Sequence, residues 1–291
     1  SATFVSWYNA HPDFVSLCPD LDTKNVVILG NGNVAIDVAR VLVKTREEMS
    51  SSDLPEYAGL AIESSPITDV YMIGRRGPIE AKFTNVELRE MGELTDAVSL
   101  VKEEQLPDSI GELENAREQR LKQKNLDTLK TFAKNKLDDA KKRVHFGFWS
   151  RPLKILGDEK VKAIEMEETA LEVGKVVGTG KIYEIECGLV IPAIGYKSLA
   201  IKGLPFDSQN SIISNIDGRV EEGVYVVGWI KRGPSGVIST NRPDGVLVAD
   251  HIITDFSSGG TKTGRKNFKK LLNELGINFI NFEGWKMIEE A

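Results

Sequence analysis

One glycine-containing turn constrains the fold of this chain more than any other part of the sequence. Residues 24–29 (KNVVIL) form a short apolar run rich in β-branched side chains, which is typical of a buried strand. This run leads into Gly30-x-Gly32-x-x-Ala35, and residues 36–44 (IDVARVLVK) then carry apolar side chains at helical spacing. A strand, a glycine turn and a helix in this order are typical of a dinucleotide-binding unit.

Each small residue of this turn has a physical reason to be there. Gly30 permits the tight turn, Gly32 lets the backbone approach a pyrophosphate, and Ala35 lets the helix pack closely on the strand. The unpaired N–H groups and the positive dipole end of the helix then favour a bound phosphate. The pattern predicts an α/β, Rossmann-like domain that binds a dinucleotide.

A pair of arginines follows the second predicted strand, residues 70–73. Rossmann domains that select NAD usually place an acidic residue about 20 positions after the turn. Here that stretch belongs to a polar insertion, residues 45–66, and the late second strand ends in Gly74-Arg75-Arg76-Gly77-Pro78. Two guanidinium groups suit the 2′-phosphate of NADP, and a solvated surface pair is the alternative. The sequence therefore predicts NADP rather than NAD.

The remaining segments predict further elements around this unit. Residues 84–94 have a helical pattern in which Thr84 and Glu87 could form a capping box. Residues 112–143 form a long, highly charged stretch that predicts a single helix. Residues 161–168 and 182–186 have the alternation of strands in a small antiparallel meander.

Seven short motifs together point to one protein family. They are residues 4–12 (FVSWYNAHP), 30–40 (GNGNVAIDVAR), 74–78 (GRRGP), 83–84 (FT), 87–90 (ELRE), 194–198 (IGYKS) and 227–238 (VGWIKRGPSGVI). In these motifs, which keep the family's order over nearly the whole chain, the sequence closely resembles adrenodoxin reductase and its bacterial ferredoxin–NADP reductase relatives. More distant relatives of the glutathione-reductase type usually carry Gly-Asp where this chain has Gly228-Trp229.

The resemblance implies a flavoprotein that takes a hydride from NADPH onto FAD and passes single electrons to a ferredoxin. It implies a glutathione-reductase-like arrangement in which residues 1–195 form the NADP-binding domain and residues 196–291 are a C-terminal segment of the FAD-binding domain. Flavin performs the difficult chemistry, so no acid–base residue is strictly required. The expected location is the cytoplasm, with the mitochondrial matrix as the alternative.

The resemblance also implies a set of cofactor-binding residues. The expected NADP contacts are Gly30, Asn31, Gly32, Asn33, Val34, Arg75, Arg76 and Glu87. The expected FAD contacts are Trp229, Gly236, Val237 and Ile238, with Gly236 also facing the nicotinamide. Asp37, one turn into the Rossmann helix, is the catalytic candidate near the nicotinamide and flavin. A carboxylate in a structural hydrogen bond is the alternative for Asp37.

The sequence departs from the family in having a single glycine fingerprint. Family members begin with a separate strand, glycine turn and helix that bind the ADP part of FAD, whereas the one fingerprint here is assigned to NADP. We therefore expect the N-terminal half of the FAD domain to be missing and the apolar faces of residues 196–291 to be exposed or covered by a neighbouring chain. The alternatives are an NADP-binding subunit that needs a separate FAD-binding half, and a glutamate-synthase-like small subunit, against which Trp229 argues.

A basic segment is present in this otherwise acidic chain. The formal net charge is -6, yet residues 117–143 contain ten Lys or Arg and four Asp or Glu, a local balance of +6. Ferredoxins are acidic, so a basic face would attract them to this part of the molecule. A solvated helix face is the alternative explanation for the same charges.

Composition argues against several other classes of protein. The net charge of -6 does not favour nucleic-acid binding. No apolar run approaches the roughly 18 residues that a membrane span needs. The two cysteines, Cys18 and Cys187, form no Cys-x-x-Cys motif and are expected to be free thiols. The histidines, His11, His145 and His251, have no metal-ligand spacing, so no metal site is predicted.

Overall fold

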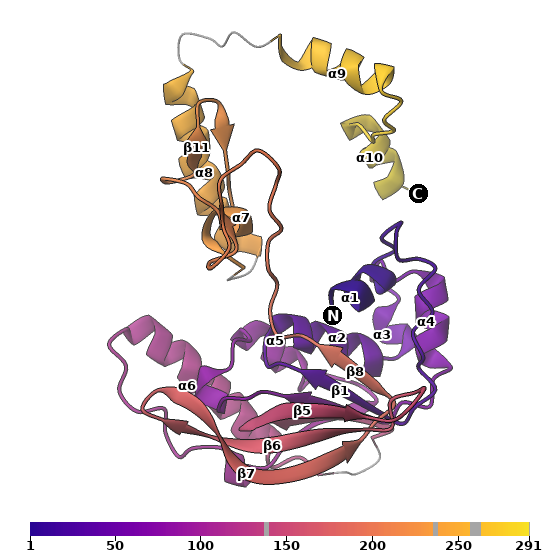
Figure 1. Ribbon diagram of the computed structural model, residues 1–291. Helices are drawn as coiled ribbons and strands as arrows, with labels where there is room; N and C mark the ends of the chain where they lie inside the picture. The colour runs from indigo at the N-terminus through magenta and orange to yellow at the C-terminus, as the bar shows by residue number, and fades with distance from the viewer. Residues whose placement is uncertain (137–139, 235–237, 257–262, 291) are drawn as a thin grey trace. The chain divides into compact units, whose positions relative to one another are not determined.

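The computed structural model describes residues 1–136, 140–234, 238–256 and 263–290 of the chain. The chain divides into two compact units, Ser1–Tyr196 (unit 1) and Lys197–Ala291 (unit 2). Unit 1 contains the glycine turn and the arginine pair, and unit 2 contains the motif around Trp229 (Figure 1).

Unit 1 is built on a parallel sheet of five strands in the order β3-β4-β2-β1-β8. All four pairings in this sheet are parallel, so the strands end at the same edge. That edge is where ligands bind in open α/β sheets, and it brings the turn after β1 beside the turn after β2. The predicted α/β class is confirmed. The strands are β1 (Asn25–Leu29), β2 (Asp69–Ile73), β3 (Ala97–Val101), β4 (Lys142–Gly147) and β8 (Leu189–Pro192).

Alternate residues of the sheet face two different layers. In β1, Val26 and Ile28 pack in a cluster with the helices, whereas Val27 and Leu29 pack with Ile164 of the antiparallel meander. Both clusters are dry, because the β1 residues Val26, Val27 and Ile28 have no exposed surface. The sheet is therefore covered on both faces, which explains why β1 and β8 are nearly continuous apolar runs.

The second covering layer is an antiparallel meander in the order β5-β6-β7 (Figure 1). Its strands are β5 (Ser150–Leu156), β6 (Ala163–Glu172) and β7 (Lys175–Glu186). The prediction of a meander was right, but the strands are longer than expected. The chain reverses within Val173-Gly174, whose positive φ angles of 48° and 76° form a tight turn. This turn lets the flanking residues continue the ladder instead of forming a loop.

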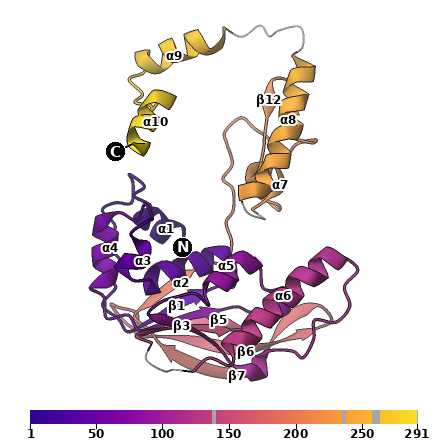
Figure 2. The ribbon, with the colours of Figure 1, turned by 180° about the vertical axis from the view of Figure 1, so that it is seen from behind.

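The helices of unit 1 cover the opposite face, and Figure 2 shows the longest of them, α6, from the other side. The prediction of a single helix over residues 112–143 was wrong, because α6 is the only helix among the described residues of this range. The Asn115 side chain caps α6 at its start, and the chain leaves the helix after Phe132 so that β4 can pair with β2. The helices are α1 (Ala2–Tyr8), α2 (Asn33–Val43), α3 (Arg46–Met49), α4 (Glu56–Glu63), α5 (Asn85–Glu90) and α6 (Ala116–Phe132).

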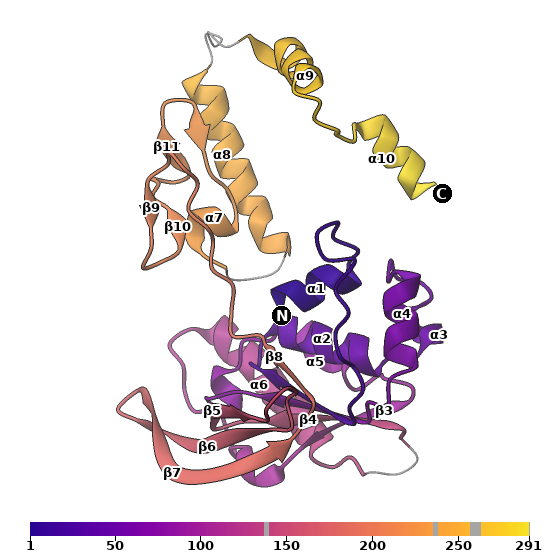
Figure 3. The same cartoon turned by 45° about the vertical axis from the view of Figure 1, so that its right-hand side comes forward.

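Two local expectations in unit 1 need correction. Helix α5 is shorter than residues 84–94, and Thr84 is its N-cap residue without the side-chain hydrogen bond of a capping box. The N–H of Thr84 instead donates to the Asn33 side chain at 2.8 Å. The polar insertion contains both α3 and α4, and α4 lies beside α1, where the Tyr57 hydroxyl donates to the Trp7 carbonyl at 2.6 Å (Figure 3).

Unit 2 is small and has short strands. Among its described residues, the buried hydrophobic side chains are those of Ile213, Val226 and Val248. Its two hairpins pair β9 (Phe206–Asp207) with β10 (Ile212–Ile213), and β11 (Arg219–Glu221) with β12 (Val224–Tyr225). Its helical segments are α7 (Trp229–Arg232), η3 (Ile238–Thr240), α8 (Asn241–Asp255), α9 (Gly264–Glu274) and α10 (Phe282–Glu289). In the described part of the chain, we find no helix that is both long and apolar enough to span a membrane.

Candidate cofactor site at the glycine turn

Gly30 is required by both its backbone and its surroundings. Its φ angle of 133° is one that residues with a side chain rarely adopt. A Cβ atom at this position would collide with the Ala193 carbonyl oxygen, where the chain leaves the neighbouring strand β8. The Gly30 N–H donates to the Ile73 carbonyl at 2.7 Å, which ties the turn to the end of β2. The expected role of Gly30 in the tight turn is confirmed.

The start of α2 presents backbone donors at the same edge. Gly32 is the N-cap residue, and the first bonds of the helix run from the N–H groups of Ala35 and Ile36 to the Gly32 carbonyl, at 3.0 and 3.2 Å. The N–H groups of Asn33 and Val34 precede these bonds and have no partner inside the helix. Ala35 is completely buried, which allows the close contact between helix and sheet. This geometry can hold a phosphate at the helix N-terminus.

The asparagine side chains of the turn have structural partners. The Asn31 amide nitrogen donates to the Gly147 carbonyl at 2.9 Å, and Asn33 accepts from the Thr84 N–H. The side-chain oxygen of Asn31 is buried and has no hydrogen-bond partner among the described residues. Both asparagines therefore shape the turn, and the hydrogen bond from Thr84 uses the Asn33 side-chain oxygen as acceptor.

Arg75 and Arg76 lie at the end of β2, where the sequence suggested them. Both side chains are exposed, and no ion pair of either is found in the described part of the chain. Two exposed guanidinium groups without an anionic partner at the binding edge of the sheet can receive a phosphate. The exposure is also consistent with a solvated pair, so their role is still a prediction.

Asp37 belongs to a small network of charges on α2 and α5. Its carboxylate accepts from Arg40 at 2.7 Å, and Arg40 also pairs with Glu90. Burial raises the pKa of Asp37 above its usual value, the charge of Glu87 adds to this, and Arg40 acts in the opposite direction. The ion pair agrees with the structural alternative for Asp37, whose side chain is 44% exposed.

Three buried acceptors without a partner in the described part of the chain lie on segments that follow β1 and β2 in the sequence. Within the described residues, the buried Oε2 atoms of Glu80 and Glu87 have no hydrogen-bond partner, and the same holds for the Asn31 oxygen. Buried polar atoms are rarely left unpaired in proteins. Asn31 follows β1, Glu80 lies in the 3-10 helix η1 (Pro78–Glu80), and Glu87 lies in α5. Donor groups of a bound nucleotide, such as ribose hydroxyls and amides, would satisfy such atoms, so the turn fits a dinucleotide.

The structure describes only some of the residues expected to contact FAD. Gly236 and Val237 lie outside the described residues, and Ile238 begins η3. Trp229 begins α7 after Gly228, whose positive φ of 65° forms the turn, and its side chain is 38% exposed. The FAD contacts of these residues therefore stay predictions.

An ion-pair cluster in unit 2 was not predicted. Asp244 of α8 accepts from Lys231 at 2.8 Å and from Arg232 at 2.7 Å, and these two basic residues share the short helix α7 with Trp229. The cluster holds the motif of residues 229–232 against α8. The sequence contains this acid and these bases, but their separation of 12 and 13 positions has no local periodicity that would pair them.

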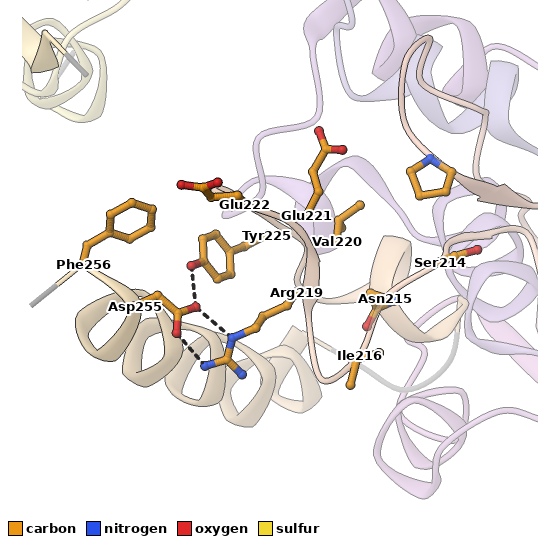
Figure 4. Close-up of a pocket in the computed structure, with 12 residues that line it drawn as sticks. Ser214, Asn215, Ile216, Arg219, Val220, Glu221, Glu222, Tyr225, Asp255 and Phe256 are labelled. Atoms are coloured by element: carbon orange, nitrogen blue, oxygen red, sulfur yellow. Dashed lines mark hydrogen bonds and ion pairs between the residues drawn. The ribbon is translucent and has the colours of Figure 1, made fainter. Parts of the chain in front are cut away.

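A cavity of about 700 Å³ lies within unit 2, remote in sequence from the glycine turn (Figure 4). Inside it, Asp255 accepts two hydrogen bonds from Arg219, at 2.8 and 3.0 Å, and one from the Tyr225 hydroxyl at 2.7 Å. These bonds lower the pKa of Asp255 to about 2. Because acid and base neutralise each other, the cluster has a structural explanation, and we assign no cofactor to this cavity.

The basic segment is less uniform than its composition suggested. Lys122 pairs with Glu118 at 2.9 Å, and Lys130 donates to the Asp108 carbonyl at 2.7 Å. At the start of β4 and just before it, three more of the ten basic residues also have partners: Lys141 with Asp96, Lys142 with the Leu42 carbonyl and Arg143 with Asp69. The predicted acids Asp138 and Asp139 lie outside the described residues. The exposed basic side chains on α6 are Arg117, Arg120 and Lys124.

Comparison with known proteins identifies relatives over almost the whole chain. No family model matches the sequence. The chain is 37% identical over 314 residues to the mitochondrial NADPH:adrenodoxin oxidoreductase of Arabidopsis thaliana, covering 98% of this chain and 65% of the relative. It is 37% identical over 268 residues to the NADPH-ferredoxin reductase FprA of Mycobacterium tuberculosis, covering 90% of this chain and 58% of that protein.

A solved structure gives the same result. The fold matches Mycobacterium tuberculosis FprA in complex with NADPH with a TM-score of 0.80 at 32% identity, covering 99% of this chain and 62% of that one. The sequence resemblance and the Rossmann-like fold are thus confirmed. The chain spans less than two thirds of the length of these relatives.

Proposed function

We propose that this chain belongs to the adrenodoxin-reductase-type ferredoxin–NADP reductases. It binds NADPH at its glycine turn as part of an NADPH–ferredoxin oxidoreductase. The proposal rests on where two groups of residues lie in the sheet. The phosphate-binding start of α2 and the exposed pair Arg75 and Arg76 lie at the same edge of one parallel sheet. The relatives named for NADPH support the choice of nucleotide.

Each part of the site has a separate task in this proposal. The N–H groups at the start of α2 hold the pyrophosphate, and Arg75 and Arg76 hold the 2′-phosphate. The unpartnered Oε2 of Glu87 accepts a hydrogen bond from the nucleotide. Asp37 lies one turn further along α2 and contributes a carboxyl with a raised pKa to the nicotinamide end. Unit 1 is thereby the NADP-binding domain, and unit 2 is the C-terminal segment of the FAD-binding domain.

The flavin requires more than the described residues provide. When bound, FAD supplies the group that accepts a hydride and releases electrons one at a time. Its pyrophosphate needs its own glycine turn and helix start, and we find one such arrangement in the described part of the chain, at Gly30–Val34. We therefore propose that Trp229 and residues 236–238 contact one side of the flavin, and that a further polypeptide segment supplies the rest of that site.

The partner is proposed to be a ferredoxin, which contacts a basic stripe on α6. Arg117, Arg120 and Lys124 are three and four positions apart, so they share one face of the helix, and all three are exposed. Acidic electron carriers are attracted by such a face, with a strong dependence on salt. The partners named for the relatives support this class.

The nucleotide assignment is tested by calorimetric titration of the full chain with NADP⁺ and NAD⁺. We expect NADP⁺ to bind at least tenfold more tightly, because charge-assisted hydrogen bonds contribute about 1.5–3 kcal/mol. The double substitution Arg75→Ala and Arg76→Ala should remove most of this preference and leave NAD⁺ binding nearly unchanged. Equal affinity of the unsubstituted chain for both nucleotides would refute the assignment.

The docking stripe is tested by the binding of a [2Fe–2S] ferredoxin to the full chain at low and high salt. Charge reversal at Arg117, Arg120 and Lys124 should weaken binding at low salt and flatten its salt dependence. A matched control reverses three exposed lysines on other elements of unit 1, Lys102, Lys154 and Lys175, with the same change in net charge. If both variants lose binding equally, net charge rather than this stripe is responsible.

A further inference from the structure

The loop that carries Arg75 and Arg76 is held by three successive backbone carbonyls. The Gly74 carbonyl accepts from the Ser150 N–H at 3.1 Å, and the Arg76 carbonyl accepts from the Trp149 N–H at 3.2 Å. Between them, the Arg75 carbonyl accepts from the Thr169 hydroxyl at 2.9 Å. The donors come from the start of the meander and from β6, so the meander braces this loop as well as covering the sheet.

Thr169 differs from the other two donors because it uses its side chain. Trp149 and Ser150 donate through the backbone, which no substitution other than proline removes. Thr169 is 5% exposed, and its own N–H donates to the Trp149 carbonyl at 2.8 Å. Its hydroxyl is therefore fixed in direction and shielded from water, where a hydrogen bond to a carbonyl is difficult to replace.

The loop also packs against an aromatic ring. A Cβ atom at Gly77 would collide with the indole of Trp149. Trp149 itself has a left-handed backbone with a φ of 57°, which a side-chain-bearing residue adopts only when its surroundings impose it. The backbone of residues 74–77 is thus held by Trp149 and Thr169, whereas the two arginine side chains that extend from it are exposed.

We propose that Thr169 is a positioning residue that sets the preference of the site for 2′-phosphorylated nucleotides. It fixes the backbone from which Arg75 and Arg76 extend, so that less freedom has to be lost when they close on a phosphate. This inference rests on the proposed function, because it requires the arginine pair to bind the 2′-phosphate. Thr169 touches no nucleotide in this account and acts only through the Arg75 carbonyl.

The test compares Thr169→Val with the same substitution at an exposed threonine elsewhere in the meander. Valine has nearly the same shape as threonine but lacks the hydroxyl, so the Arg75 carbonyl loses its donor. The control is Thr179→Val, because the Thr179 hydroxyl donates to the Glu168 carbonyl at 3.0 Å in the same sheet without touching the arginine loop. Each full-length variant is titrated with NADP⁺, NAD⁺ and 2′,5′-ADP, and its melting temperature is recorded.

We expect Thr169→Val to weaken NADP⁺ and 2′,5′-ADP binding about three- to tenfold, the usual effect of one hydrogen bond, with NAD⁺ binding unchanged. Thr169→Ser should restore the preference, and Thr179→Val should keep it. If the valine variant does not fold, Thr169→Cys carries the same test with a weaker donor.

Two failures can be told apart. If the unsubstituted chain binds NADP⁺ and NAD⁺ equally, the proposed function fails and the role of Thr169 fails with it. If the unsubstituted chain prefers NADP⁺ but Thr169→Val keeps the full preference, the proposed function stands and the role of Thr169 is refuted. Equal weakening of NADP⁺ and NAD⁺ would likewise refute it, because that result indicates a general loss of structure.

Discussion

Units 1 and 2 both contain many large hydrophobic side chains, but they bury them to very different extents. The strands of unit 1 place alternate residues in two separate cores, one under the helices and one under the meander. In the described part of unit 2, three hydrophobic side chains are buried, while Phe268, Phe282 and Met287 are 60%, 66% and 72% exposed. The proposed nucleotide site thus belongs to the unit with two extensive cores, whereas the Trp229 motif belongs to the unit with few buried hydrophobic side chains in its described part.

The strongest test of this difference separates the two units. We expect residues 1–196 to unfold cooperatively when expressed alone, because both faces of their sheet are covered. We expect residues 197–291 to show no cooperative transition, since their buried apolar area is too small to offset the loss of chain entropy. Thermal unfolding followed by near-UV circular dichroism measures both fragments. A sharp transition in the second fragment would show that unit 2 has a sufficient core of its own.

A pair of leucine substitutions makes the comparison quantitative. Leu129 of α6 is completely buried, and Leu275 at the end of α9 is 63% exposed. Leu129→Ala should lower the free energy of unfolding of unit 1 by about 2–5 kcal/mol, through lost burial and the cavity that remains. Leu275→Ala should change it by less than about 0.5 kcal/mol. Urea unfolding of the full chain, followed by a signal from unit 1, distinguishes the two; similar losses would mean that Leu275 is buried in solution.

The smallest expected effect concerns Asp37 and pH. Its folded pKa is raised above the usual 3.8, so the folded state binds a proton more readily than the unfolded chain. The stability that this carboxyl contributes is present below pH 3.8 and is lost as the pH rises through its raised pKa. Asp37→Asn should therefore flatten the pH dependence of the free energy of unfolding in that window. An unchanged pH profile would indicate that the Arg40 ion pair cancels the effect of burial.

The nucleotide site could be predicted from sequence because its main features are local. Gly30 lies between a strand and a helix in the sequence, and Arg75 and Arg76 directly follow a strand, so position along the chain already indicates position at the sheet edge. The brace of this site could not be predicted. Thr169 and Arg75 are 94 positions apart and meet through a backbone carbonyl, which leaves no pattern in the residue types.

The prediction of a single helix over the charged residues 112–143 was wrong. Their composition favours a helix throughout, but the pairing of β4 with β2 and β3 takes residues 142–147 into the sheet. Tertiary pairing therefore overrides local propensity at this point. The same pairing places the basic residues in α6, in β4 and between them. The exposed ones include Arg117, Arg120 and Lys124 on α6 and Lys134 and Lys136 after it.

The cofactor content of the full chain tests directly whether it binds NADP⁺ and lacks a complete flavin site. Purified residues 1–291 are incubated with excess FAD and NADP⁺, and the bound amounts of each are measured by equilibrium dialysis and visible absorption. We expect one NADP⁺ per chain, bound by unit 1, and no stoichiometric flavin, because the flavin contacts proposed for unit 2 reach only one side of the cofactor. One tightly bound FAD per chain would contradict this expectation and would show that unit 2 forms a complete flavin site.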